Sequence, residues 1–281
     1  MAIQFVGRKI ATKEGAVSGN TTISLSSGLT GGSRAAVAEG DLVIAVFSTG
    51  STADRTLSIT DGTTDYDLIG SELYANGIST DVNLRVAMKR MGSTPDGSVT
   101  FGPSLNAQDA ACTAVAVFSG VDPTVPLDGV TVETATFTTP IANPPPITPS
   151  TAGAFIVCVG AGSISSFSFG NYSSSDLTGF FSSSANDTNC SILGIGHKDD
   201  WSSGSFDPAA FSYPSSASTY SAAAMSFVLR PDPAPPSSGG NIKVWNGSAW
   251  VAKPVKVWNG SAWVTKPVKR WNGSGWITTP Y

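Results

Sequence analysis

The first 230 residues alternate between short apolar runs and turn residues, and no segment of 11 or more residues shows a convincing helical periodicity. Turn residues separate the runs, as in DGTTD (61–65) and TPDG (94–97). The clearest runs are DLVIAVFS (41–48), RTLSIT (55–60), VNLRVAMKRM (82–91) and CTAVAVFSG (112–120). This pattern predicts an all-β fold whose body, residues 1–231, has the strand spacing of a β-sandwich or jelly roll.

Two of these runs predict different surroundings. The run DLVIAVF is apolar throughout, which predicts a strand buried on both faces. In VNLRVAMK large apolar residues instead alternate with polar, charged or small residues, which predicts one buried face and one solvent-exposed face. The expected buried face has Val82, Leu84, Val86 and Met88, and the expected exposed face has Asn83, Arg85, Ala87 and Lys89.

A weaker repeat runs through the body. Three segments recur in the same order and at similar spacing: 41–48 in 154–163, 82–91 in 190–199, and 113–120 in 223–230. The repeat indicates a duplicated sheet unit, although strands rich in Val, Ala and Phe also resemble one another by composition alone. The Pro-rich stretch 142–150 is where two halves, 1–141 and 151–231, would join. The pattern leaves open whether the halves form one sandwich or two.

A Pro/Ser/Gly linker at 232–240 precedes a tandem repeat at 241–281, in which a 13-residue unit occurs three times as KVWNGSAWVAKPV, KVWNGSAWVTKPV and KRWNGSGWITTPY. The repeat holds six of the seven tryptophans in the chain. These six are the candidate assembly or binding residues: Trp245, Trp250, Trp258, Trp263, Trp271 and Trp276.

The first copy is nearly palindromic around Gly247 and Ser248, which predicts a β-hairpin. A turn centred there, with Gly at the first central position of a type II′ turn, pairs Trp245 with Trp250. A type I′ turn at Asn246-Gly247 is the alternative, but it would place Trp245 opposite Ser248. We favour the centred register because a cross-strand aromatic pair contributes about 0.5–1.5 kcal/mol beyond its buried area.

In that register one face of each hairpin carries the Trp pair and the other carries apolar residues such as Val. A lone two-stranded hairpin is marginally stable in water, so both faces need cover. Packing among the three hairpins, or among tails of several chains, would supply it, and stacking of the indoles on sugar rings is the alternative. Packing is favoured because burial is the usual use of Trp. The Asn-Gly-Ser in each copy matches a glycosylation sequon, and we interpret it as turn chemistry.

Charge and cysteine content narrow the function classes. Charged residues make up 13% of the chain and the net charge is −4, with no long Lys/Arg run, so we expect neither nucleic acid nor membrane as a partner. No signal peptide is apparent, which predicts synthesis in a cytoplasm without export by an N-terminal signal. The odd number of cysteines predicts buried free thiols at Cys112, Cys158 and Cys190.

Catalytic candidates are few. The only histidine, His197, would have to serve any Ser-His-Asp arrangement, and no G-x-S-x-G motif is present. We interpret it as a strand-end histidine with ordinary solvation. Asp199 and Asp200 precede Trp201, but neighbouring strand residues point to opposite faces, whereas glycosidase carboxyl groups must face each other. We therefore expect no catalytic residue and no enzymatic activity.

The loop DGTTDYD groups Asp61, Asp65 and Asp67, and oxygen-rich loops can hold Ca²⁺. The spacing departs from an EF-hand, and a solvated turn with Asx hydrogen bonds is the favoured interpretation. No zinc spacing or Gly-rich phosphate loop is present, so we expect no metal and no cofactor.

The tandem pattern W-N-G-S-A-W-V-x-K-P-V resembles the C-terminal repeats of tail and fibre proteins of tailed bacteriophages. The body is similar to β-rich minor tail or virion proteins of phages and prophages. The segments that carry this similarity are GDLVIAVFSTG (40–50), RTLSITDGTTDYDLIG (55–70), NLRVAMKRMG (83–92) and AVAVFSGVDPTVPLDG (114–129). The resemblance covers most of the chain.

The resemblance implies a non-enzymatic structural protein of the virion, made in the host cytoplasm. A tail fibre, spike or minor tail protein is the main expectation, with the C-terminal repeat as an assembly or attachment module. The implied partners are other virion proteins and further copies of the chain, with a trimer as the first expectation from the habit of fibres. The alternatives are an adhesin for host surface glycans, and a capsid decoration or head-fibre protein.

Overall fold

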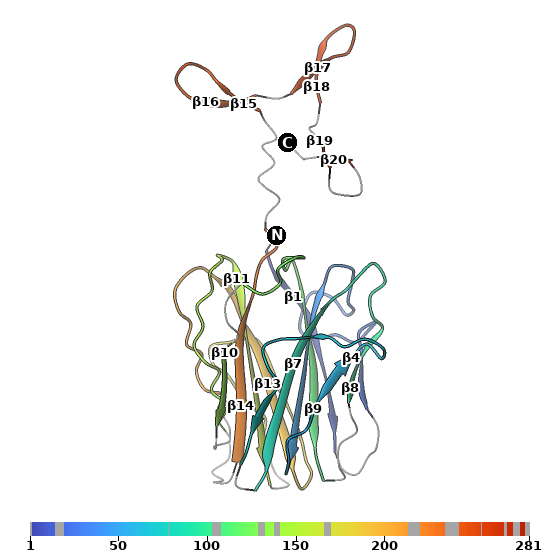
Figure 1. Ribbon diagram of the computed structural model, residues 1–281, viewed down its shortest axis with the longest axis vertical. Coiled ribbons are helices and arrows are strands. Elements are labelled where there is room, and N and C mark those ends of the chain that lie inside the picture. Colours follow the sequence, from blue (N-terminus) through green and yellow to red (C-terminus); the bar gives the residue numbers. More distant parts are fainter. Residues whose placement is uncertain are drawn as a thin grey trace. The chain divides into compact units, whose positions relative to one another are not determined.

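The computed structural model confirms an all-β fold: the described residues form strands, turns and loops and contain no helix (Figure 1). Two compact units are present, a body at Ala2–Asp232 and a tail at Pro233–Tyr281. Most of the predicted linker, at 234–240, lies outside the described residues. The structure describes residues 2–14, 20–77, 79–102, 108–128, 133–137, 141–165, 170–212, 220–233, 242–253, 255–266, 269–271 and 276–278.

The described residues of the body form three antiparallel sheets. The first has the order β1 (Gln4–Lys13), β9 (Ala111–Ser119), β3 (Leu42–Ser51), β7 (Asp81–Arg90) and β5 (Asp67–Leu68), with β6 (Leu73–Ala75) also paired to β7. The second has the order β10 (Glu133–Phe137), β14 (Tyr220–Leu229), β11 (Ala154–Ile164), β13 (Cys190–Trp201) and β12 (Thr178–Ala185). The third consists of β2 (Thr21–Ser24), β8 (Ser98–Gly102) and β4 (Ser58–Thr60).

The first and second sheets share one strand order. In each, the second long strand along the chain (β3 or β11) is central and lies between the last strand (β9 or β14) and the one before it (β7 or β13). The first strand of each set, β1 or β10, pairs with the outer side of the last. The three sequence echoes fall on these equivalent strands, which favours an internal duplication.

The junction between the halves differs from the prediction. Strand β10 pairs with β14, so it belongs to the second sheet, and the chain changes sheets between β9 and β10. The Pro-rich stretch 142–150 follows β10, and within it Ala142 and Ile147 are buried against the second sheet. The expected junction at 142–150 was wrong because β10, with the polar sequence ETATF, carries no hydrophobic pattern that marks a strand.

The two halves build one sandwich-like body with a shared core. The central core consists of buried apolar residues from both large sheets, among them Leu42, Ile44, Val46, Val157, Val159 and Ala161. These six come from β3 and β11, the central strands, at alternate positions that face the same side of each sheet. The sheets therefore stack face to face over this core. The sequence had left open whether the two halves form one sandwich or two.

Strand β3 is buried on both faces, as its uninterrupted apolar run predicted. Its other face contributes Val43, Ala45 and Phe47 to a second core beneath the small third sheet. There the rings of Phe47 and Phe101 meet edge to face with centroids 5.8 Å apart.

The predicted solvent-exposed face of β7 is instead largely covered. Asn83 is fully buried, and its Oδ1 accepts a hydrogen bond from the backbone N–H of Arg55 at 2.8 Å. Lys89 is half-buried and forms an ion pair with Asp61 at 2.6 Å. The prediction was wrong because the chain after β3 crosses this face, and the local alternation of residue types carries no information about such a distant cover.

Loops cover the outer face of the second sheet, and two glycines make room for them. Gly160 and Gly194 are cross-strand partners on β11 and β13. A Cβ on Gly160 would lie 2.7 Å from the ring of Phe211, and one on Gly194 would lie 3.2 Å from it. Phe211 is fully buried and packs edge to face on Phe180 with centroids 5.0 Å apart. Because Gly160 and Gly194 have no side chains, the ring of Phe211 packs directly on the sheet.

We expect Gly160→Ala to destabilise the body by about 1–3 kcal/mol, because the added methyl group overpacks the site of Phe211. Gly97→Ala is the matched control, since a Cβ there meets nothing within 4 Å. In a Phe211→Ala background, where the ring is gone, the cost of Gly160→Ala should shrink. Urea unfolding monitored by circular dichroism measures all four variants. Equal unfolding midpoints for the two glycine variants would contradict this packing argument.

Candidate functional site

The tail contains three separate two-stranded hairpins, and each pairs its two tryptophans. The partners are Trp245 with Trp250, Trp258 with Trp263, and Trp271 with Trp276. The strands are β15 (Ile242–Trp245) with β16 (Trp250–Lys253), β17 (Lys256–Trp258) with β18 (Trp263–Thr265), and β19 (Lys269–Trp271) with β20 (Trp276–Thr278). This is the centred register favoured from the sequence, and the alternative with Trp245 opposite Ser248 is not formed.

The Asn-Gly-Ser segment closes the turn. Asn246 Oδ1 accepts hydrogen bonds from the N–H and hydroxyl of Ser248 and the N–H of Ala249, at 2.9, 3.1 and 2.8 Å. Gly247 has a φ of 101°, a conformation that favours glycine. Asn259 forms the same three bonds in the second copy. The sequon is therefore turn chemistry in both described turns, and the third turn, at 272–275, lies outside the described residues.

The paired tryptophans are exposed. Trp245 and Trp250 are 52% and 66% exposed, and Trp258 and Trp263 are 51% and 65% exposed. In both pairs the ring centroids lie 5.9 Å apart at an angle of 59°. Two copies therefore present the same aromatic surface, and half or more of each indole remains open to a partner. The side chains of Trp271 and Trp276 lie outside the described residues.

The opposite face of each described hairpin is also uncovered. Val244 and Val257 are 46% and 47% exposed, while their cross-strand partners Val251 and Val264 are half-buried. A hairpin has only two layers of side chains, so neither layer can shield the other. The tail therefore exposes apolar surface on both faces.

His197 does not lie at a solvated strand end. It is 4% exposed on β13, and the rings of Phe5, Phe118 and Phe155 surround it with centroid distances of 4.9, 5.7 and 5.5 Å. Its Nδ1 bonds Asp199, while Nε2 is buried and has no hydrogen-bond partner among the described residues. The prediction of ordinary solvation was wrong because Phe5 and Phe118, which cover the imidazole, belong to the first sheet and lie far from His197 in the sequence. The described part of the chain places no hydroxyl on Nε2, so it assembles no Ser-His-Asp relay there.

The residues after His197 have local structural contacts. Asp200 adopts a φ of 46°, at a point where the register of β11 and β13 shifts. Trp201 Nε1 donates a hydrogen bond to the Gly204 carbonyl at 3.0 Å, and its ring packs on Phe206 with centroids 5.3 Å apart. Asp199 bonds the buried imidazole of His197, and its side chain is 44% exposed.

Asp61 forms the Asx turn favoured from the sequence. Its Oδ1 accepts bonds from the N–H and hydroxyl of Thr63 and the N–H of Thr64, at 2.8, 2.8 and 2.7 Å. Lys89 bonds its Oδ2, and this contact with the backbone bonds holds the pKa of Asp61 well below its usual value. Asp65 and Asp67 are exposed. No group of three or more His, Cys, Asp or Glu suited to a metal ion occurs in the described ranges.

The three cysteines are buried free thiols, as predicted. Burial raises the pKa of Cys112 and of Cys158 to about 12, so these thiols remain protonated and unreactive near neutral pH. No described helix has the length and apolar character needed to span a membrane.

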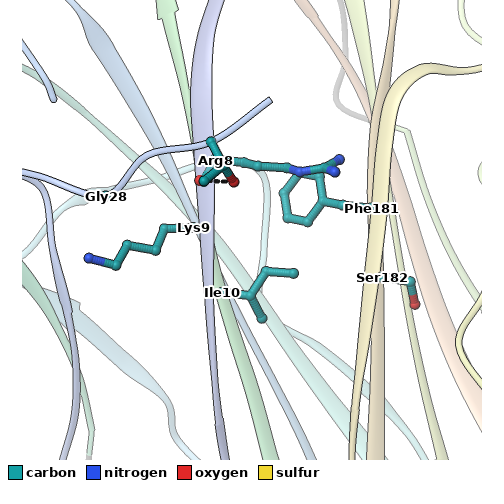
Figure 2. Close-up of a pocket in the computed structure, with 7 residues that line it drawn as sticks. Arg8, Lys9, Ile10, Gly28, Phe181 and Ser182 are labelled. Carbon is teal, nitrogen blue, oxygen red and sulfur yellow. Dashed lines mark hydrogen bonds between the residues drawn. The ribbon is translucent and has the colours of Figure 1, made fainter. Parts of the chain in front are cut away.

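A recess of about 490 Å³ lies between β1 and β12, at the edges of the two large sheets (Figure 2). Its charged residues already bind the protein itself. Arg8 Nη1 donates to the carbonyls of Gly179 and Phe180 at 2.9 and 2.8 Å, and its guanidinium lies 4.7 Å from the centre of the Phe181 ring. Lys9 Nζ donates to the Ser27 carbonyl at 3.0 Å. The recess therefore lies where the edges of the two large sheets meet, and Arg8 links these edges through its hydrogen bonds.

We expect Arg8→Met to destabilise the body by about 1–2 kcal/mol, because two carbonyl groups of the β12 edge lose a charged donor while the apolar stem is kept. Lys9→Met is the matched control, since its bond to Ser27 is exposed and its bond to the Ser24 carbonyl is long at 3.4 Å, and it should cost less than about 0.5 kcal/mol. Urea unfolding measures both. Equal losses of unfolding free energy in the two variants would show that Arg8 does not link the sheet edges.

Acidification should weaken the body through His197. Desolvation lowers the pKa of His197, and Asp199 offsets this only in part, so the fold favours the neutral imidazole. The unfolded chain therefore binds the extra proton first, and stability present above about pH 6.5 is lost as the pH falls below that value. The drop in melting temperature from pH 7.5 to pH 5 should be smaller in His197→Leu than in the parent chain. An identical drop would exclude this role.

The chain was compared with protein-family models, with curated proteins and with solved structures, and none of the three comparisons found a match. Its candidate site therefore rests on geometry and chemistry alone. Two described hairpins present equivalent exposed Trp pairs, and the backbone of the third has the same pairing. Arg8 and His197, by contrast, are engaged in holding the body together. The tryptophans of the tail are the candidate functional site.

Proposed function

We propose that the chain is a structural component of a bacteriophage virion, a tail fibre, spike or minor tail protein whose tail is an assembly or attachment module. The observation that carries the proposal is the repeated WNGSAW hairpin with its exposed Trp pair. A monomeric soluble domain rarely exposes such aromatic surface in tandem without a partner for it. The resemblance of the same repeat to the ends of phage tail and fibre proteins supports this role.

The energetics of the tail support a role in contact with a partner. Trp buries about 150–250 Å² when fully covered, so the open half of one indole corresponds to about 100 Å². Covering it would contribute about 2–3 kcal/mol before the cost of association is subtracted. Several such indoles on one chain could support a stable contact, whereas a single hairpin could not.

The body suits a passive role. Its central core joins two large sheets, and a small sheet and packed loops seal their outer faces. Its titratable candidates serve stability: His197 is packed among aromatic rings, and Asp61 closes a turn. We therefore propose that the protein is not an enzyme and needs no cofactor. Its proposed partners are other virion proteins and further copies of itself, as a trimer in the first instance.

Removal of residues 241–281 should abolish oligomerisation or incorporation into the particle while the body still folds. The reason is that the central core and its covering layers lie within Ala2–Asp232. Light scattering measures the mass with and without the tail, and the melting temperature checks the body. An unchanged mass together with normal incorporation would refute the role of the tail. The copy number in purified particles distinguishes a tail component, present in few copies, from a capsid decoration protein, present in many.

A further inference from the structure

The charges of the chain are segregated between its two ends. Residues 241–281 hold six of the 16 Lys and Arg and none of the 20 Asp and Glu. The tail therefore carries a formal charge of +6, and residues 1–240, with ten basic and 20 acidic side chains, carry −10. The net charge of −4 conceals a basic, Trp-rich tail. Its basic residues are Lys243, Lys253, Lys256, Lys266, Lys269 and Arg270.

These cations occupy defined faces of the hairpins. Strand residues two apart share a face, so Lys256 lies on the same face as Trp258, whose cross-strand partner is Trp263. Lys256 is exposed beside these two exposed indoles. Lys243 and Lys269 hold the same register position in the other copies, two residues before the first Trp. The Trp face of the second hairpin therefore combines two exposed indoles with one exposed ammonium group.

This charge argues against packing of the Trp faces of sister tails on one another, and it leaves the opposite face free for assembly. Packing Trp faces of several tails together would bring like charges close, with no acidic side chain in the repeat to offset them. The occupant of the Trp face should instead carry negative charge together with rings that can stack on indoles. The charge density also distinguishes among such ligands. A single-stranded nucleic acid has one phosphate for each base, whereas the Trp face offers one cation for two indoles.

We propose that the Trp faces bind an acidic polysaccharide with about one anionic group for every two sugar rings. Sugar rings stack on the indole pair, and the acidic group pairs with Lys256 or with its equivalents Lys243 and Lys269. This rests on the attachment role of the tail proposed above and names its ligand class. Three copies of the repeat with one backbone register suit a polymer with a repeating unit, because three weak contacts on one molecule add through effective concentration.

The test uses the full-length chain and immobilised hyaluronan, which has one carboxylate for two sugars, with dextran as the neutral polymer. We expect retention on hyaluronan that weakens with added salt, a change in Trp fluorescence on binding, and little retention on dextran. The triple variant Lys243→Gln, Lys256→Gln, Lys269→Gln should bind about tenfold more weakly, since each exposed ion pair contributes about 0.5 kcal/mol.

A matched variant separates this site from general electrostatics. Lys253, Lys266 and Arg270 lie on the opposite face by the same alternation, so changing all three to Gln removes the same charge. That variant should keep most of the affinity. Equal losses in the two triple variants would overturn the proposal. So would tighter binding to oligo-dT or to phosphatidylglycerol vesicles, or no binding to either hyaluronan or unsulfated chondroitin.

The same variants separate this inference from the proposed function. The Trp-face triple variant should still enter particles and keep its oligomeric mass while it loses polysaccharide binding. Normal incorporation without any polysaccharide binding by the parent chain would overturn the ligand and leave the virion role intact. Loss of incorporation by the Trp-face variant would show that this face contacts other virion proteins, which also overturns the ligand.

Discussion

The face-to-face packing of β3 and β11 is the contact on which the rest of the body depends. Each is the central strand of its sheet, and the alternate residues of each enter the central core. A strand that is apolar on both faces needs a second cover, because its other face cannot remain in water. The third sheet supplies that cover for β3, and loops carrying Phe206 and Phe211 supply it for β11. The layered arrangement of the body therefore follows from the need to cover both faces of β3 and β11.

One local hydrogen-bonding arrangement recurs in both units. Asp61, Asp122, Asn246 and Asn259 each accept bonds through one side-chain oxygen from a Ser or Thr two residues later and from the next N–H. In the body these turns accompany sheets that have a core. In the tail they close hairpins that have none. The register of the tail is therefore held by short-range bonds, which form without tertiary burial.

This difference explains what the sequence could predict. The Trp register depends on residues within one repeat, and the burial of β3 depends on its own apolar run, so both were predicted correctly. The environment of His197 depends on Phe5 and Phe118, which lie far away in the chain. The cover over Asn83 comes from a loop around Arg55, again outside its strand. Local periodicity reports which residues could be buried, whereas the identity of the covering segment is set by topology.

The two units handle apolar surface in opposite ways. The body stacks sheets until both apolar faces of β3 and β11 are covered. A hairpin has no third layer, so its indoles remain open whatever register it adopts. Self-cover by sister tails would have to overcome repulsion among cations that no acid in the repeat offsets. A ligand with both rings and negative charge would cover the exposed indoles and neutralise the positive charge of the tail. This is the physical reason to expect that the partner of the Trp faces lies outside the chain.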